Sequence, residues 1–387
     1  MWTRKLAAVV IMAGALTGCG KHPAVGILLP TTGNANAYGE SIESGIRVAL
    51  AEAREKGTLP ADLDILWADT GSDPQKAVSE FRSLVGDKGA KIVIGGATSD
   101  EARALLPVLA ELKVICLSPS ASAPDLAKKS EYFFRIFPSD ELEGSRAGRF
   151  LFEELKAKKV VLFAGDNEYS RGIEPEFRHQ YVETLGGEIV ARIDVTKDGW
   201  RTLAARTLDS SKPDAVYIIG YADQILDVLR LLDKTGFEGR ICTTSAFYSG
   251  KVIQEAGKLA EGVFFPLPPF DRTSESPYVR AFVTRYTDTY QRAPDVFAAH
   301  GYDAMKVVLK AIEIAHPVET PELNKALHFT EFKGVTGPIR FDDYGEVKHY
   351  PKMFLVKDGQ VLSYDRYLKE ERKRILNELR NLFHSTG

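Results

Sequence analysis

The sequence is poor in the residues that build disulfide frameworks and metal sites. It has three cysteines and seven histidines among 387 residues, and it contains neither a CxxC nor an HExxH motif. His, Cys, Asp and Glu also do not recur with the spacing of metal ligands. We therefore expect no metal and no other cofactor. Cys116 and Cys242 each lie inside an apolar segment, and we expect two unpaired, buried thiols.

The chain also lacks a large excess of charge of either sign. The 50 basic and 53 acidic residues give a formal net charge of −3, and no long run of either sign occurs. A nucleic-acid-binding protein would need a basic patch or stripe, so this class is excluded. The sequence has no GxSxG motif either, which removes one clear sign of a serine hydrolase.

The apolar run near the start of the chain is too short to span a membrane. It extends from Leu6 to Leu16 behind two basic residues, whereas a spanning helix needs about 20 apolar residues. These features are typical of an export signal. The run ends in Leu16-Thr17-Gly18-Cys19, which resembles the bacterial lipoprotein cleavage box. That resemblance implies removal of residues 1–18 and a lipid anchor on Cys19, on the periplasmic or cell-surface side of a bacterial membrane. The alternative is an ordinary buried cysteine after an uncleaved helix.

The most informative stretch runs from residue 91 to residue 126. It predicts one apolar strand over Lys91–Gly96 and another over Val114–Leu117, joined by a helix over residues 100–112. A loop of small hydroxyl residues follows each strand. In a parallel sheet both loops lie at the carboxyl ends of strands, where ligands bind, and free N–H groups at a helix N-terminus favour an anion. We therefore predict a site for a small anionic group, although such residues also serve only to cap helices and close turns.

Strands and helices alternate twice along the chain. The first run has strands predicted at 25–30, 63–68, 91–96, 114–117 and 133–137, and the second at 160–165, 188–195, 215–221 and 240–244. Such alternation indicates βαβ units. We predict an α/β protein with two doubly wound parallel-sheet lobes. Later residues turn mostly helical, then form a hairpin, and end in a charged amphipathic helix over residues 369–387.

Several short motifs then resemble those of one family. In order along the chain they are Tyr38-Gly39, Asp73-Pro74, Val93-Ile94-Gly95, Ser118-Pro119, Ala123-Pro124 and the late run FKGVTGPIRFD at residues 332–342. Together they are similar to the branched-chain amino acid (Leu/Ile/Val) receptors of the type I periplasmic binding fold. Each motif is weak alone, and their order carries the resemblance, which covers nearly the whole chain after the export signal.

The resemblance implies a particular division of the chain. Two lobes would be joined by three crossings that act as a hinge, and the lobes would close over a ligand in the cleft between them. Lobe 1 would comprise residues 24–138 and 268–337. Lobe 2 would comprise residues 139–267 and 338–368, followed by the C-terminal helix.

The resemblance also implies the ligand contacts. In the family, hydroxyls and amides of two lobe 1 loops hold the ligand's carboxylate, and these positions fall on Ser99, Ser120 and Ser122. Aromatic positions of the family fall on Tyr38, at the lobe 1 rim, and on Tyr169 and Tyr221, which would cover the ligand from lobe 2. The alternative is that each tyrosine packs at a strand end or in the core.

One position departs from the family. Its amino-acid-binding members place an acidic residue after the strand at 240–244 to accept the ligand's ammonium group, whereas this chain has Ser245. An ammonium buried without a carboxylate is costly. Either another acid substitutes, for which Asp140 and Asp303 are candidates, or the ligand has no α-amino group. The position of Asp140 is more typical of a helix cap, and that of Asp303 is more typical of a helix-packing residue.

We therefore expect a lipid-anchored, extracytoplasmic solute-binding protein, and not an enzyme. It would deliver an amino acid or a related small carboxylate to the membrane subunits of an ABC permease. The alternative within the same fold is a ligand-sensing or regulatory envelope lipoprotein. An exported amidase with a cleft serine would need a general base near Ser99 or Ser120. The nearby acids, Asp100 and Glu101, are instead typical of the first turn of a helix.

Overall fold

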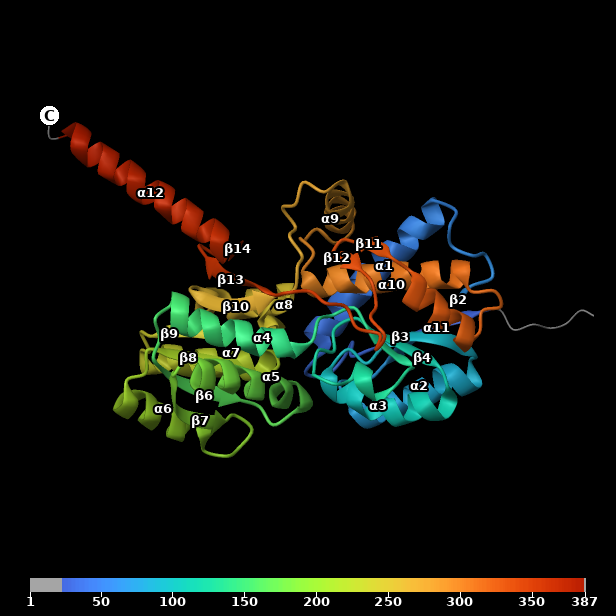
Figure 1. Cartoon of the computed structure of the whole chain (residues 1–387), viewed down its shortest axis with the longest axis horizontal. Helices are drawn as coiled ribbons and strands as arrows, with labels where there is room; N and C mark the ends of the chain where they lie inside the picture. The colour runs from blue at the N-terminus through green and yellow to red at the C-terminus, as the bar shows by residue number, and fades with distance from the viewer. Residues whose placement is uncertain (1–22, 386–387) are drawn as a thin grey trace, which may run out of the picture.

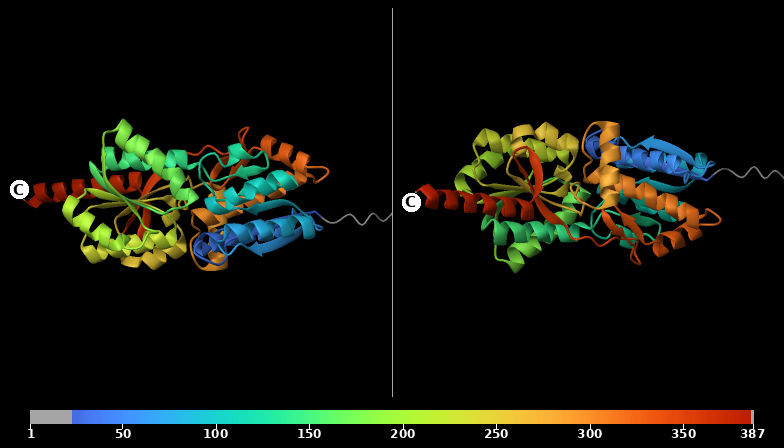
Figure 2. Two further views of the ribbon diagram at one scale, coloured as in Figure 1. Left: turned by 90° about the horizontal axis from the view of Figure 1, so that it is seen from below. Right: turned by 90° about the horizontal axis from the view of Figure 1, so that it is seen from above.

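The computed structural model describes residues 23–385, which form two lobes side by side and a long helix that projects from one of them (Figure 1). Views from below and from above show the same arrangement (Figure 2). The export signal predicted at residues 1–18 and the predicted lipidation site, Cys19, lie outside the described residues. Among residues 23–385, none of the helices combines the length and the apolar character that a bilayer span requires.

Lobe 1 is built on a parallel sheet with the strand order β2-β1-β3-β4-β5. Its strands are β1 (Ala24–Leu29), β2 (Asp64–Asp69), β3 (Ala90–Gly95), β4 (Ile115–Ser118) and β5 (Phe133–Arg135). The helices around the sheet are α1 (Asn36–Glu55), α2 (Pro74–Arg82), α3 (Ser99–Leu112), α9 (Pro277–Tyr290), α10 (Val296–Ile314) and α11 (Thr320–Phe329). The last three helices come from late in the chain, so the lobe combines two separate segments.

The strands of lobe 1 are apolar on both faces because helices cover both faces. Val25 and Ile27 belong to the buried cluster that includes α1 and α10, whereas Leu28, the residue after Ile27, belongs to a second cluster with Phe81 of α2 and Leu105 of α3. Successive side chains of a strand point to opposite faces. Continuous apolar strands of this kind are characteristic of parallel sheets buried between two helix layers.

Lobe 2 repeats this arrangement with the strand order β7-β6-β8-β9-β10. Its parallel strands are β6 (Lys159–Ala164), β7 (Glu188–Asp194), β8 (Ala215–Ile219), β9 (Arg240–Thr243) and β10 (Val263–Leu267), and β13 (Lys352–Lys357) and β14 (Gln360–Ser363) add an antiparallel hairpin. Its helices are α4 (Asp140–Arg149), α5 (Glu168–Arg178), α6 (Trp200–Ser211), α7 (Ala222–Thr235) and α8 (Gly250–Ala256). The predicted α/β class with two parallel-sheet lobes is confirmed.

The shared strand order places a crevice in each lobe. The first strand of each run lies between the second and the third, as β1 lies between β2 and β3 and β6 lies between β7 and β8. In a sheet of this order ligands bind at the carboxyl ends of the strands, at the point where the order reverses. The loops after β1 and β3, and those after β6 and β8, are therefore the places to look for a site.

The segment around residue 345 contacts the sheet of lobe 1. The Arg135 N–H at the end of β5 donates to the Gly345 carbonyl at 2.9 Å, and a parallel bridge joins Arg135 to Glu346. Residues 345–346 are thus held on the sheet of lobe 1, although we had assigned residues from 338 onward to lobe 2. We propose that the last crossing between the lobes lies between residue 346 and β13, with the other boundaries as expected.

Some elements were not foreseen from the sequence. Helices α8 and α11 are additional, and β11 (Phe332–Gly334) pairs with β12 (Gly337–Ile339) in a short hairpin of its own. The C-terminal helix α12 (Tyr364–Ser385) begins earlier than residue 369 and leaves Leu368 and Ile375 exposed. Cys116 in β4 and Cys242 in β9 are buried, unpaired thiols, as predicted.

Candidate ligand-binding site

A small cavity lies between the two lobes, at the carboxyl ends of the parallel strands of both. Its volume is about 30 Å³, and it is lined by Tyr38, Ala97, Thr98, Ser99, Ser120, Ser122, Phe137, Tyr169, Tyr221, Ser245, Ala246 and Phe297. Every residue that we predicted to contact the ligand is in this set. The structure thus brings together loops from distant parts of the chain around one candidate site.

The first turn of α3 forms part of the lobe 1 wall. Thr98 caps the helix, because its hydroxyl accepts the Glu101 N–H at 3.2 Å and the Glu101 carboxylate accepts the Thr98 N–H at 3.3 Å. Glu101 also accepts a hydrogen bond from the Thr70 hydroxyl at 2.6 Å, and burial raises its pKa to about 7. Its role as a helix cap, predicted from the sequence, is confirmed.

The serines of lobe 1 tie two loops to each other. The Ser99 hydroxyl accepts the N–H groups of Ser122 and Ala123 at 3.4 and 3.2 Å, so its own proton is free to point elsewhere. The Ser120 hydroxyl donates to the Ala97 carbonyl at 2.6 Å. Ser99 is therefore placed to donate to a ligand carboxylate, whereas Ser120 already uses its proton within the loop.

Aromatic rings surround the rest of the cavity. Tyr169 and Tyr221 of lobe 2 stack with their ring centroids 5.3 Å apart, and Tyr38 of lobe 1 lies 6.2 Å from Tyr221. Phe297 packs against Tyr38 at 4.9 Å and against Phe137 at 6.0 Å. The walls are apolar over their faces, and the tyrosine hydroxyls provide polar contacts at the edges.

Tyr38 joins the two lobes directly. Its hydroxyl donates to the Ala246 carbonyl at 3.0 Å and accepts the Ala222 N–H at 2.8 Å, and both partners belong to lobe 2. Tyr38 is buried at 4% exposure. The residue that we expected only at the rim therefore also holds the cleft closed.

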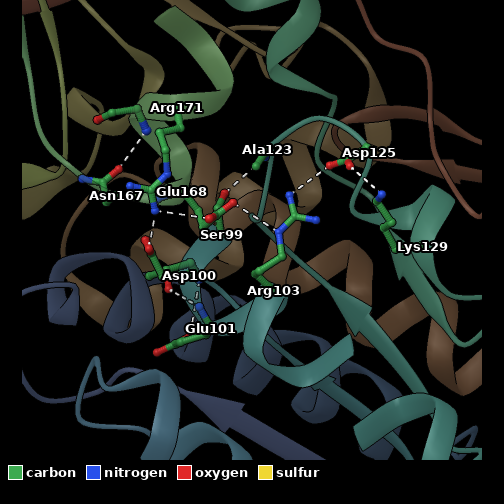
Figure 3. A network of polar contacts seen from close by, with 12 residues as sticks. Ser99, Asp100, Glu101, Arg103, Ala123, Asp125, Lys129, Asn167, Glu168 and Arg171 are labelled. Atoms are coloured by element: carbon green, nitrogen blue, oxygen red, sulfur yellow. Dashed lines mark hydrogen bonds and ion pairs between the residues drawn. The ribbon is translucent and has the colours of Figure 1, made fainter. Parts of the chain in front are cut away.

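Asp100 forms a second connection between the lobes. Its carboxylate accepts the Tyr221 hydroxyl at 3.1 Å and the Glu168 N–H at 3.0 Å. Next to it, Arg103 pairs with Glu168 of lobe 2 at 3.2 Å and with Asp125 of lobe 1 at 2.9 Å (Figure 3). Sequence reasoning assigned Asp100 only to the first helical turn, because its partners come from lobe 2 and nothing in the local sequence indicates them.

Ser245 lies between the cavity and a buried acid, Glu143, which we did not predict from the sequence. The Ser245 N–H donates to Glu143 Oε1 at 2.8 Å, and the Tyr169 hydroxyl donates to the same atom at 3.3 Å. The Tyr169 and Ser245 hydroxyls are 3.4 Å apart. Glu143 is 4% exposed, and burial raises its pKa to about 7.

The two acids that we considered as substitutes behave differently. Asp303 accepts the N–H groups of Val335 and Thr336 at 3.0 and 2.9 Å and the Thr336 hydroxyl at 2.7 Å, so it holds the hairpin at residues 332–339 and lies away from the cavity. Asp140 lies beside Ser122 and Glu143, and burial followed by the Glu143 charge raises its pKa. Neither Asp140 carboxylate oxygen has a hydrogen-bond partner among the described residues. Within that same part of the chain, no group of three or more His, Cys, Asp or Glu residues is placed to hold a metal ion.

The chain matches known proteins over nearly its whole length. The sequence model described as "Periplasmic binding protein" matches residues 23–360. A leucine-, isoleucine-, valine-, threonine- and alanine-binding protein of Pseudomonas aeruginosa is 25% identical over 325 residues, which are 83% of this chain and 86% of that protein. A solved leucine-binding protein of Thermotoga maritima is 26% identical, with a TM-score of 0.81 and coverage of 88% of this chain and 97% of that one. A branched-chain amino acid transporter substrate-binding protein of Streptococcus pneumoniae, solved in complex with isoleucine, is 26% identical, with a TM-score of 0.81 and coverage of 88% and 98%.

Proposed function

The chain belongs to the periplasmic binding protein family, and from this premise we propose that it captures an amino acid or a related small carboxylate for an ABC permease. The observation that carries the proposal is the cavity between the lobes, where the loop serines of lobe 1 face the tyrosines of lobe 2. A donor-rich wall opposite an aromatic wall suits the chemistry of a small organic acid with an apolar side chain, and because a cavity of about 30 Å³ holds little more than one water molecule, the lobes would part to admit it. The relatives named for amino-acid binding support the same ligand class.

The contacts across the cleft support capture by closure. Tyr38 and Asp100 each bond to lobe 2 from lobe 1, and both lie beside the cavity or its lining residues. A ligand that contacts both walls adds to these bonds only when the lobes are together, so it stabilises the closed form. A permease can then distinguish the loaded protein from the empty one by its shape.

Hydrolysis by a cleft serine has little support. Glu101 is engaged with Thr70 and Thr98, and Asp100 is engaged with Tyr221 and Glu168, so the two acids nearest to Ser99 in sequence are both occupied. A general base must reach the proton that it abstracts. The site supports binding better than catalysis.

A ligand screen tests the proposal. The 20 common L-amino acids and their deaminated carboxylate analogues would be screened by thermal shift, followed by calorimetry on any ligand that raises the melting temperature. A ligand that binds only the folded state raises its apparent stability. We expect at least one compound of the panel to bind and to lose affinity in Ser99→Ala. Absence of binding by the whole panel would overturn the proposal.

The lipid anchor is a separate proposal that rests on the sequence around Cys19. Acyl chains attached to one cysteine would hold the protein at a membrane surface. Expressed in a bacterium with its own leader, the parent should partition with membranes, and Cys19→Ala should move to the soluble fraction. Equal partition of both proteins would show that Cys19 carries no anchor. Cys116→Ala is a matched control, because this buried thiol should not affect partition.

A further inference from the structure

We propose that Glu143 provides the negative charge that recognises a cationic amino group on the ligand, acting through the hydroxyls of Tyr169 and Ser245. The inference rests on the proposed function and narrows its ligand class to amino acids. It also answers the question raised by Ser245, which stands where an acid was expected. The negative charge is carried by Glu143 of α4, which contacts Ser245 from the side away from the cavity.

The geometry places Glu143 one layer behind the cavity. Tyr169 and Ser245 line the cavity, while Glu143 does not. Glu143 Oε1 accepts the Ser245 N–H at 2.8 Å and the Tyr169 hydroxyl at 3.3 Å. An ammonium group in the cavity can donate to the oxygen atoms of these two hydroxyls. Each hydroxyl then directs its proton toward the carboxylate, so the charge behind them strengthens both contacts.

Further polar groups around Glu143 lack partners. The Tyr217 hydroxyl is buried and makes no hydrogen bond among the described residues. The buried carboxylate oxygens of Asp140 and the buried hydroxyl of Thr244 make no close hydrogen bond there either, although the Ser122 hydroxyl is near enough to lower the pKa of Asp140 and Thr244 faces Tyr169. Asp140 is 1% exposed, and Tyr217 and Thr244 are at 0%. Buried polar groups in native proteins are nearly always satisfied, so several unsatisfied groups in one place point to a polar occupant. An ammonium group would donate hydrogen bonds to this cluster of buried oxygen atoms.

The charges around Glu143 leave the cluster negative. The titratable side chains that face Glu143 or its neighbour Asp140 come from several elements: Tyr169 of α5, Tyr217 of β8, Cys242 of β9 and Arg135 of β5, with Arg146 of α4 near Cys242. Burial raises the pKa of each of the tyrosines and of Cys242, so they stay neutral near pH 7. Arg135 is already paired with Glu346 at 2.6 Å. Its charge therefore does little to balance a second carboxylate.

Asp140 and Glu143 do not both need to be ionised when the cleft is empty. Burial raises the pKa of both Asp140 and Glu143, and the Glu143 charge raises that of Asp140 further. Near neutral pH the pair therefore retains at least one proton. A bound ammonium group favours the ionised form, so an amino acid should expel a proton from the pair. A carboxylate ligand without an amine would instead bind best while the pair stays protonated.

Calorimetry on matched ligands tests the inference. Each amino acid that binds the parent would be compared with its deaminated analogue, for example leucine with 4-methylpentanoate, in the parent, in Glu143→Gln and in Glu141→Gln. We expect Glu143→Gln to weaken the amino acid by about tenfold or more and to leave the analogue within about twofold. Glu141 lies on the same helix but is exposed, so Glu141→Gln should match the parent.

The possible results separate failure of the proposed function from failure of the proposed role of Glu143. If no compound of either class binds, the proposed function fails and this inference fails with it. If only amine-free carboxylates bind, the function stands and the role of Glu143 is overturned. Equal loss of both ligand classes in Glu143→Gln would also overturn it, because that pattern indicates structural damage alone.

The pH dependence of affinity provides a second readout that does not need a variant to fold. In the parent, affinity for the amino acid should rise between pH 6 and pH 7.5, by up to about tenfold per pH unit below the pKa. Glu101 also has a pKa of about 7 and lies near the lobe 1 wall, so the difference between the parent and Glu143→Gln isolates the effect of Glu143. Affinity that falls with rising pH, relative to the variant, would overturn the inference.

Discussion

The two walls of the cleft occupy equivalent positions in two similar lobes, yet their chemistry is opposite. After the first strand come Tyr38 in lobe 1 and Tyr169 in lobe 2, and after the third strand come Ser99 and Tyr221. In lobe 1 the buried acid near the cavity, Glu101, is fully engaged in capping α3. In lobe 2 the buried acids stand behind aromatic and serine hydroxyls, and Asp140 has no hydrogen-bond partner among the described residues. The difference teaches that one topology can supply both a donor-rich wall for an anion and an acceptor-rich wall for a cation.

The asymmetry follows from what lies behind each loop. Helix N-termini, which favour negative charge, reach the cavity from both lobes, because α3 begins at Ser99 and α7 begins after Tyr221; the difference therefore lies in the buried side chains. On the lobe 2 side, the first turn of α4 places Glu143 beneath Ser245, while Asp140 of the same turn lies beside Ser122 of the lobe 1 loop. A zwitterion lying across the cleft would satisfy both sides at once. The predictions below test one wall against the other.

The largest effect is expected at Ser99. Ser99→Ala removes a donor to the ligand carboxylate and leaves the Ser122 and Ala123 N–H groups without this acceptor. A hydrogen bond to a charged group is worth about 1.5–3 kcal/mol, so calorimetry should show affinity lower by roughly tenfold or more. Ser120→Ala is the matched control, since the Ser120 hydroxyl already donates to Ala97. Equal losses in the two variants would mean that Ser99 has no special role in the lobe 1 wall.

The next effect concerns the stability of the empty protein. The pKa of Glu143 is about 7 in the folded state and about 4.3 in an unfolded chain. A raised folded pKa means that stability is full below about pH 4.3 and is lost as the pH rises to about 7. Relative to Glu143→Gln, the parent should therefore lose stability over this window, on the order of 3 kcal/mol by pH 7.

Chemical denaturation at several pH values would measure this difference. Glu101 is present in both proteins, so its own titration cancels. Glu141→Gln, an exposed change on the same helix, should follow the parent at every pH. A stability difference that does not change with pH would place the Glu143 carboxylate in a more polar environment than we describe.

A double variant should move the charge within the lobe 2 wall. Ser245→Glu alone would add a third carboxylate beside Asp140 and Glu143, and like charges in a buried site repel. Ser245→Glu combined with Glu143→Gln restores the original number of acids and places one where the family carries it. We expect the double variant to recover about tenfold in amino-acid affinity relative to Glu143→Gln alone. Lack of recovery, with a folded protein by circular dichroism, would show that position 245 does not face the amine.

The smallest effect is expected at the contact between the walls. Tyr221→Phe removes the hydrogen bond to Asp100 and so weakens closure, while the ring remains stacked on Tyr169. A hydrogen bond to a charged group contributes about 1.5–3 kcal/mol, but Asp100 keeps its other bond across the cleft, to the Glu168 N–H, so the ligand should dissociate a few-fold faster in stopped-flow measurements. Tyr344→Phe, at an exposed tyrosine, is the control. An unchanged dissociation rate would mean that the Asp100 contact does not hold the cleft closed.

Much of this architecture could be predicted because its signals are local. Apolar strands ending in loops of small hydroxyl residues identify the carboxyl edges of the sheet, and this is why the loops of Ser99 and Ser122 were predicted to face a ligand, whereas Tyr221 was predicted from the resemblance to the family; all three line the cavity. The acid behind Ser245 could not be predicted in the same way. Glu143 lies in the first turn of α4, where acids are common, and only the packing of α4 against α5 and β10 makes it buried.

The contacts between lobes were unpredictable for a similar reason. Asp100 is an ordinary first-turn acid by sequence, and its bonds to Tyr221 and Glu168 exist only because the lobes are together. The proposed late boundary also depends on a tertiary contact, the bridge from Arg135 to Glu346. Short elements such as α11 were missed because a ten-residue helix with few apolar positions gives a weak periodic signal.

Proton exchange during binding tests the central claim of a polarised cleft most directly. Calorimetry of an amino acid in two buffers with different ionisation enthalpies, at about pH 6.5, gives the number of protons released or taken up. We predict a net release in the parent, because an ammonium group lowers the pKa of the Asp140–Glu143 pair, and a much smaller release in Glu143→Gln. Proton uptake, or an equal release in both proteins, would contradict the claim that lobe 2 binds the ligand's cationic end.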